Sequence, residues 1–116
     1  MAVYVDPAAW PFGRMMMCHL WADTDAKLHA FARQLGLERR WHQCPPKASW
    51  SHYDISKSKR ALAVRLGAVE TDKYGPSEHV ARLAGNTRRL EQIARIRARE
   101  HAAAVSAPSP DLFAGA

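Results

Sequence analysis

Hydrophobic residues recur at helical spacing in the first third of the chain. The apolar stripe consists of Leu28, Phe31, Ala32 and Leu35. This period predicts a helix over 23–37, with Asp23 and Thr24 as candidate N-caps. Gly36 is expected to end the helix, because glycine readily adopts the left-handed conformation that follows many helix C-termini.

A second helix of the same design follows. Its apolar positions are Leu62, Ala63 and Leu66. Ser56 or Ser58 is the candidate N-cap, and Gly67 is expected to end this helix. The segments 31–37 and 62–68 are therefore two versions of one unit, in which a helix is followed by a glycine and an extended segment.

Strand-like segments lie before and between these helices. The segments 3–5 and 68–71 predict strands, and so does 39–43, which Pro45 and Pro46 would end. The segment 50–55 fits either a short strand or a loop. Strands that alternate with helices favour an α/β layer fold with right-handed crossovers. We therefore expect a small, mostly parallel sheet of about three to four strands with flanking helices.

The remainder of the chain predicts two more helices. Pro76, directly after Gly75, is typical of a helix start, and this third helix is expected to end near Leu83. A longer helical pattern extends from Thr87 to Val105, where five arginines and two glutamates give a net charge of +3. This segment therefore predicts a basic C-terminal helix.

These patterns divide the chain into three parts. We expect a small α/β domain over 1–85, a basic amphipathic helix over 86–105, and a disordered tail over 106–116, which is rich in small residues and proline. The apolar positions of the basic helix leave a third role open, in which it pairs with another copy of the chain. These positions are Leu90, Ile93 and Ile96.

Composition narrows the class of protein. The 116 residues carry a net charge of +6 and are 47% hydrophobic, and no apolar run approaches the roughly 18 residues of a membrane span. A disordered or membrane-spanning protein is thus disfavoured. Residues 1–13 do not resemble a secretory signal, and two cysteines cannot build a disulfide framework, so a cytoplasmic location is expected. The chain has no phosphate-binding glycine loop, GxSxG elbow or HExxH helix.

Polar residues that follow the predicted strands are the candidate site. They are Asp6, His19, Asp23, His52 and Asp54. Asp6 follows the first strand, and His52 and Asp54 precede the second helix. His19 and Asp23 lie in the first connection. Ligands of an open α/β sheet bind beyond the carboxyl ends of its strands, so we expect these groups to share one edge of the sheet.

Imidazoles and carboxylates together can perform acid–base or metal chemistry. His52 and Asp54 are two residues apart and would face the same way in a strand, where they could act as base and orienter. They could also bind a divalent metal with Asp6 as third ligand, and His19 could be a further ligand or the acid. The candidate catalytic residues are therefore His52, Asp54, His19 and Asp6.

Each candidate also has a structural alternative. Asp23 and Asp54 precede helices and could serve only as caps, and Asp6 before a proline fits a turn. A zinc set made of two thiolates and two imidazoles is a further alternative, but its spacing matches no common zinc motif. Its members would be Cys18, His19, His42 and Cys44.

The basic residues suggest a contact with nucleic acid or a nucleotide. Candidate nucleic-acid-binding residues are Lys57, Lys59, Arg60, Arg95, Arg97 and Arg99. Trp41, Trp50 and Tyr53 lie near some of them in sequence, and cations beside accessible aromatic rings suit phosphate binding and base stacking. The alternative is a solvated charged face with the tryptophans in the core.

Five ordered blocks of sequence resemble a known family. The blocks are Val3-Tyr4-Val5-Asp6-Pro7 with Trp10-Pro11, His19-Leu20 with Ala22-Asp23, Leu28-His29-Ala30-Phe31-Ala32, Leu35-Gly36-Leu37 and His52-Tyr53-Asp54. Over residues 1–75 the chain resembles bacterial and phage domain-of-unknown-function family 4031, whose members are often shorter and lack a counterpart of 87–116. The resemblance implies no particular activity. It adds His29 to the residues of interest, although helical spacing places His29 at the core boundary.

Two functions remain open from the sequence. The first is a hydrolase with a His/Asp site that acts on a phosphorylated ligand, such as a nucleotide or nucleic acid, either by acid–base catalysis or with the help of a divalent metal. In this hypothesis the positive surface steers the anionic ligand. The second is a non-enzymatic accessory protein that binds nucleic acid or another protein through its basic helix. No membrane partner is expected.

Overall fold

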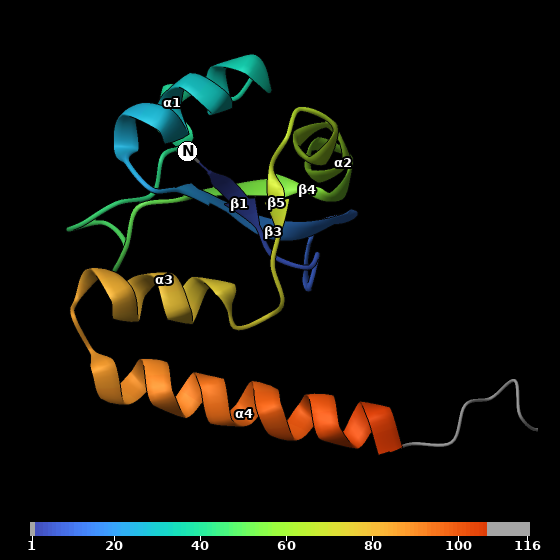
Figure 1. The fold of residues 1–116 in the computed structure, drawn as a ribbon. Helices are drawn as coiled ribbons and strands as arrows, with labels where there is room; N and C mark the ends of the chain where they lie inside the picture. The colour runs from blue at the N-terminus through green and yellow to red at the C-terminus, as the bar shows by residue number, and fades with distance from the viewer. Residues whose placement is uncertain (1, 107–116) are drawn as a thin grey trace, which may run out of the picture. The chain divides into compact units, whose positions relative to one another are not determined.

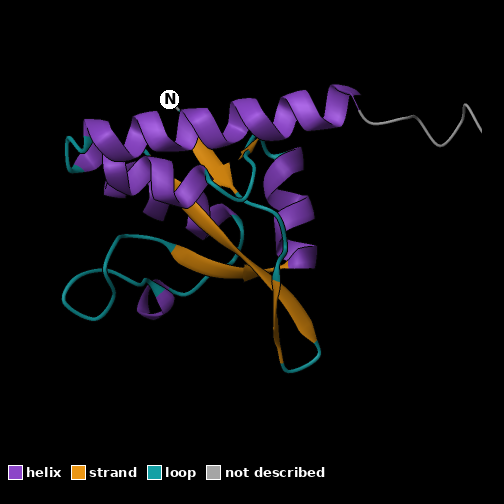
Figure 2. Ribbon diagram, turned by 90° about the horizontal axis from the view of Figure 1, so that it is seen from below, coloured by secondary structure: helices purple, strands orange, loops and turns teal. Residues whose placement is uncertain are grey.

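Strand β3 (Met15–Ala22) is the centre of the sheet. It pairs antiparallel with β2 (Trp10–Phe12) and β1 (Val3–Val5) along one edge, and with β4 (Tyr53–Ser56) along the other. Strand β1 also pairs in parallel with β5 (Val69–Glu70). This computed structural model describes residues 2–106, and within them the sheet has five strands and is mostly antiparallel (Figures 1 and 2).

The predicted mixed α/β class is confirmed, but the predicted parallel sheet is wrong. The segment after β1 turns back at Gly13, whose φ of 61° suits a tight turn, and forms the β2–β3 hairpin rather than a crossover. The segment 39–43 is not a strand, because Arg39–Trp41 forms the 3-10 helix η1. Only Gln43 of that segment pairs, in an isolated bridge with His52. The uncertain segment 50–55 supplies β4 instead.

The two helix–glycine units are confirmed. Helix α1 (Asp25–Gln34) begins at the N-cap Thr24, whose hydroxyl accepts the Lys27 N–H at 3.3 Å. Helix α2 (Lys57–Arg65) begins in the same way at the N-cap Ser56. Each helix is followed by a glycine with positive φ, 75° at Gly36 and 106° at Gly67.

The alternation of side chains along β3 builds a two-sided sheet. Cys18, Leu20 and Ala22 lie on the face that α1 and α2 cover, and these three residues belong to the hydrophobic core (Figure 1). His19 and Trp21 lie between them in sequence and therefore point to the opposite face. The other buried core residues are Val5, Leu28, Ala32, Leu35, Tyr53, Ile55, Ala63 and Ala68.

The two cysteines are expected to differ in reactivity. Cys18 is fully buried, and burial raises the pKa of its thiol to about 12, whereas Cys44 is only half-buried. Thiolates, not thiols, react with alkylating and disulfide reagents. Titration with a disulfide reagent should therefore detect one fast thiol, Cys44, in the native protein and two in denaturant. Fast reaction of Cys18 in native protein, located by peptide mapping, would contradict the burial described here.

The chain divides into two units, residues 1–80 and 81–116. Helix α3 (Gly75–Leu83) begins in the first unit, and α4 (Thr87–Ser106) belongs to the second, both close to their predicted bounds. No helix within 2–106 is long and apolar enough to span a membrane. Of the predicted tail, Ser106 ends α4, and the remainder lies outside the described residues.

Candidate functional site

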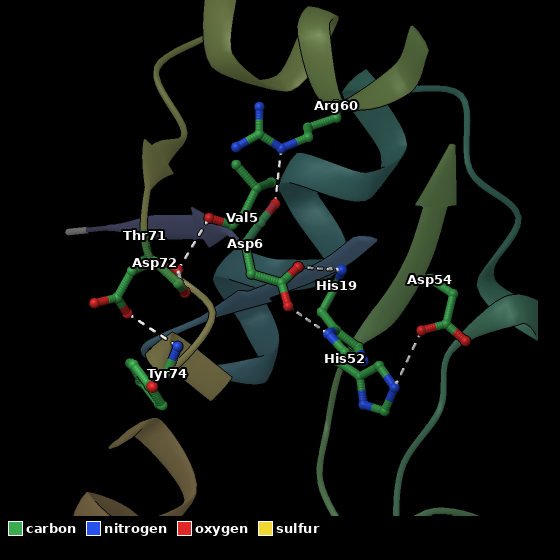
Figure 3. Close-up of polar contacts among 9 residues, drawn as sticks. All are labelled: Val5, Asp6, His19, His52, Asp54, Arg60, Thr71, Asp72 and Tyr74. Carbon is green, nitrogen blue, oxygen red and sulfur yellow. Dashed lines mark hydrogen bonds and ion pairs between the residues drawn. The ribbon is translucent and has the colours of Figure 1, made fainter. Parts of the chain in front are cut away.

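Strand register brings three of the candidate residues into one row. Val5 pairs with Leu20, so Asp6 directly after β1 lies beside His19. On the other edge of β3, His19 pairs with Asp54 of β4. Side chains at paired positions of neighbouring strands point to the same face of a sheet. Asp6, His19 and Asp54 therefore form a line across three adjacent strands (Figure 3).

His52 completes the cluster because it precedes Asp54 by two residues. Side chains two apart in an extended segment face the same way, and the His52 Nε2 lies 3.4 Å from the Asp54 Oδ1. The His52 side chain is 9% exposed, whereas that of Asp54 is 37% exposed, so the cluster opens to solvent on the Asp54 side. The ring centroids of His19 and His52 are 5.2 Å apart.

Hydrogen bonds fix the tautomers of both histidines. Asp6 accepts the His19 backbone N–H at 2.6 Å through Oδ1, and its Oδ2 lies 2.7 Å from the His19 Nδ1. The His52 Nδ1 lies 3.0 Å from the Trp50 carbonyl oxygen. A carboxylate and a carbonyl only accept, so each Nδ1 carries the proton. In the neutral rings, each Nε2 then keeps an unprotonated lone pair.

This geometry gathers atoms that donate electron pairs. His19, His52 and Asp54 each offer one ligand atom, and these atoms lie within 4.8 Å of one another. The unprotonated His52 Nε2 and the Asp54 carboxylate are both acceptors, so they attract each other only when a proton or a cation lies between them. Two imidazoles and one carboxylate are an ordinary ligand set for zinc and other divalent transition metals.

Asp6 holds the His19 ring in place but is not one of the three candidate ligand residues. Its carboxylate is directed to His19, and its side chain is 8% exposed, so it orients this imidazole rather than joining the three-atom group. The Arg60 Nε donates to the Asp6 carbonyl at 2.7 Å, and Arg60 also pairs with Glu70. Thr71 donates to the Val5 carbonyl. Helix α2 and the end of β5 therefore fix the backbone that carries Asp6 (Figure 3).

Two tryptophans flank the imidazoles. The Trp10 ring lies 4.5 Å from that of His19, and the Trp50 ring stacks on His52 at 4.2 Å. Trp21, on the same face of β3, contacts Trp50 edge-on at 5.7 Å and lies 6.2 Å from His79 of α3. The apolar rings restrict water around the site. Sequence analysis missed this shell, because the face of β3 that carries Met17, His19 and Trp21 is nearly as apolar in sequence as the core face.

Asp23 lies outside this cluster, and His19 lies on a different element from the predicted one. Asp23 follows β3 at the opposite end of β1 from Asp6, where hydrogen bonds from the Ala2 N–H and the Tyr4 hydroxyl lower the pKa of its carboxyl. It is not the N-cap of α1, which is Thr24. His19 lies within β3, not in a connection.

The proposed zinc set of two thiolates and two imidazoles is not assembled. Cys18 faces the core and His19 the opposite face. Within residues 2–106, the one group found that could hold a metal is His19 with His52 and Asp54.

Some of the candidate nucleic-acid-binding residues make contacts within the fold. The Lys59 Nζ donates to the Leu35 carbonyl at the end of α1, and Arg60 binds Asp6 and Glu70. Lys57 is exposed at the start of α2. The other three lie on α4, and binding of nucleic acid by this helix stays a prediction. They are Arg95, Arg97 and Arg99.

A second polar cluster lies beside the other face of β4. The His29 Nδ1 lies 2.8 Å from the Tyr53 hydroxyl, as expected for a histidine at the core boundary, and its ring meets that of His42 at 4.4 Å. The His42 Nε2 lies 2.7 Å from the Ser51 hydroxyl, which donates to Asp25. Burial is the main cause that lowers the pKa of both histidines.

Comparison with known proteins identifies a family but no function. The model of a family described as "Protein of unknown function (DUF4031)" matches residues 3–86, which include both polar clusters. No curated protein and no solved structure matches significantly.

Proposed function

The chain belongs to the DUF4031 family, and we propose that it is a divalent-metal-dependent hydrolase whose metal ligands are His19, His52 and Asp54. The ion would lie between the two Nε2 atoms and the Asp54 carboxylate. Asp6 acts as the positioning residue that holds the His19 ring. The tautomers of the two histidines support this proposal, because each Nδ1–H is committed to an acceptor, each Nε2 keeps its lone pair, and the candidate ligand atoms of the three residues lie within 4.8 Å of one another.

The form of the ligand set supports catalysis rather than a purely structural metal. Structural zinc sites generally have four protein ligands, whereas catalytic sites have three and leave a position for water or substrate. Here three side chains converge, and the partly exposed Asp54 marks the side from which a substrate approaches. A divalent ion in such a site polarises a phosphoryl or carbonyl oxygen and lowers the pKa of water.

The positive net charge of the chain is the reason to propose a phosphorylated substrate. The chain has a net charge of +6, which attracts anions to the protein at a distance. Phosphate esters also present the hard oxygen atoms that a divalent ion binds. We therefore infer a phosphate ester, such as a nucleotide or a nucleic acid, as the substrate class.

The proposal is tested by measuring metal binding and hydrolysis on the same samples. Metal-free protein is titrated with Zn²⁺ or Mn²⁺ by calorimetry, and the loaded protein is assayed with chromogenic phosphate mono- and diesters. We expect one ion per chain and activity that EDTA removes. The double variant His52→Ala/Asp54→Ala should lose both, since two of three ligands are absent.

Matched controls separate the site from a general loss of charge. His101→Gln removes an exposed histidine of α4, and Asp23→Asn removes a carboxylate outside the cluster. Both should keep one bound ion and full activity. Hydrolysis that survives the double variant, or an ion count that the double variant leaves unchanged, would overturn the proposed site.

A further inference from the structure

A small cavity lies where α1, η1 and β4 meet, at the second polar cluster. Its volume is about 140 Å³, below the range of roughly 300–1,000 Å³ typical of sites for drug-sized ligands. The residues that line it are His29, Ala32, Arg33, Leu37, Arg39 and Tyr53. Tyr53 lies between His52 and Asp54 in sequence but points to the other face of the sheet, so this cavity is separate from the proposed metal site.

Two guanidinium groups at this cavity have no acidic partner. Arg33 lies one helical turn after His29 on α1, and Arg39 begins η1. Neither guanidinium group forms an ion pair or a hydrogen bond with any residue in 2–106. The next residue provides a contrast, because Arg40 binds the Glu38 carboxylate through two nitrogens at 3.0 and 2.8 Å.

The remaining polar groups of the lining can also donate. His29 has its Nδ1 beside the Tyr53 hydroxyl at 2.8 Å, which leaves its Nε2 without a hydrogen-bond partner among the described residues. No carboxylate lines the cavity. The nearest acidic group on α1, Asp25, already accepts the Ser51 hydroxyl. The lining therefore offers two permanent cations and an imidazole to a small ligand.

We propose that this cavity binds a phosphate-type oxyanion, either free or as the terminal phosphoryl group of a larger molecule. Guanidinium groups match the paired oxygen atoms of phosphate, and hydrogen bonds between charged partners are the strong ones. The volume suits one tetrahedral anion and excludes a whole nucleotide from the cavity itself. The chain would thus have two chemically different sites on opposite faces of β4.

Protonation of His29 links the affinity of this site to pH. The charged groups around the ring are Arg33 and Asp25 on α1, Arg39 on η1 and the neighbouring His42. Burial, Arg39 and His42 lower the pKa of His29, so the ring is neutral at pH 7. A bound dianion favours the protonated ring, and affinity should therefore increase as the pH falls.

The test titrates sulfate into the protein in EDTA, at constant ionic strength against chloride, while NMR follows the histidine rings. Sulfate keeps its charge across the pH range, so any pH dependence belongs to the protein. We expect a saturable shift of the His29 ring signals and tighter binding at about pH 5.5 than at about pH 7.5. Arg39→Gln should raise the Kd by about tenfold or more, since it removes a charged hydrogen-bond donor.

Arg40→Gln is the matched control, because it removes the adjacent, paired arginine and should leave the Kd unchanged. A linear shift that never saturates, or equal Kd values for the two variants, would overturn the proposal. Inorganic phosphate and AMP then distinguish the sources of the anion. Equal affinity indicates recognition of the phosphoryl group alone, tighter binding of AMP indicates a larger ligand, and binding of neither overturns the site.

Discussion

Replacement of Asp6 by asparagine is expected to weaken binding of Zn²⁺ by roughly 10- to 100-fold, the range found when groups behind metal ligands are changed. Asp6 does not belong to the three-atom ligand group, so the effect must pass through His19. The substitution changes one oxygen to an amino group and leaves the size of the side chain almost unchanged. Its consequences are therefore chemical rather than steric.

The amide has two orientations, and both are unfavourable for a bound metal. If its amino group faces the His19 Nδ1, that nitrogen must accept, and the ring proton moves to Nε2, where the lone pair for the metal was. If the amide is reversed, its amino group meets the His19 backbone N–H, which Asp6 now accepts at 2.6 Å. Two donors would then face each other in a buried place.

Calorimetry with Zn²⁺ measures this loss of affinity, and ¹⁵N NMR of the imidazole reports which ring nitrogen is protonated. We expect the signature of an Nδ1–H ring in the metal-free wild type and of an Nε2–H ring in Asp6→Asn. Asp23→Asn, a carboxylate outside the cluster, is the control and should change neither result. Wild-type affinity in Asp6→Asn would show that Asp6 does not position His19 for a metal.

Replacement of Trp21 by alanine is expected to lower the free energy of unfolding by about 3–5 kcal/mol. Trp21 is 2% exposed, stacks on Tyr4 at 5.8 Å and meets the edge of Trp50 at 5.7 Å. Its removal leaves a cavity between β3, the loop that carries Trp50 and the start of α3, and the stack that supports His52 loses a neighbour. Urea unfolding followed by circular dichroism measures the effect.

Trp41→Ala is the matched comparison for the same truncation. Trp41 lies on η1 and is 47% exposed, so its loss should cost within about 0.5 kcal/mol. Trp21→Phe should retain most of the stability, because an aromatic ring still fills part of the space. Equal losses in Trp21→Ala and Trp41→Ala would mean that Trp21 does not pack as described.

The helices could be predicted from the sequence because their signals are local. Ser56, Gly36 and Gly67 act through their own backbone and their immediate neighbours, and each lies where the pattern placed it. The direction of the strands depends on distant partners instead. The run Met15–Ala22 is apolar on both faces except at His19, so its strand period is hidden, and the hairpin was missed.

The candidate residues gather for a different reason from the predicted one. We expected the carboxyl ends of parallel strands to meet, but β1 and β4 both pair antiparallel with β3. Cross-strand register places Asp6 and Asp54 on either side of His19 all the same. Asp23 comes four residues after His19, just past the end of the same strand, so an extended segment separates the two. The residue types therefore indicated the chemistry of the candidate site, but only the pairing of the strands shows which of these residues lie together.

The alternation of side chains between the two faces of β3 also limits which insertions the strand can accommodate. A single residue inserted between Met15 and His19 would exchange the two faces of this part of the strand, directing the imidazole toward the aliphatic interior and a leucine or cysteine toward water. Length variation is therefore not tolerated there, whereas the hairpin turn at Gly13 and the loop before Trp50 can vary in length without altering that order. Homologous chains should accordingly align without gaps through this strand.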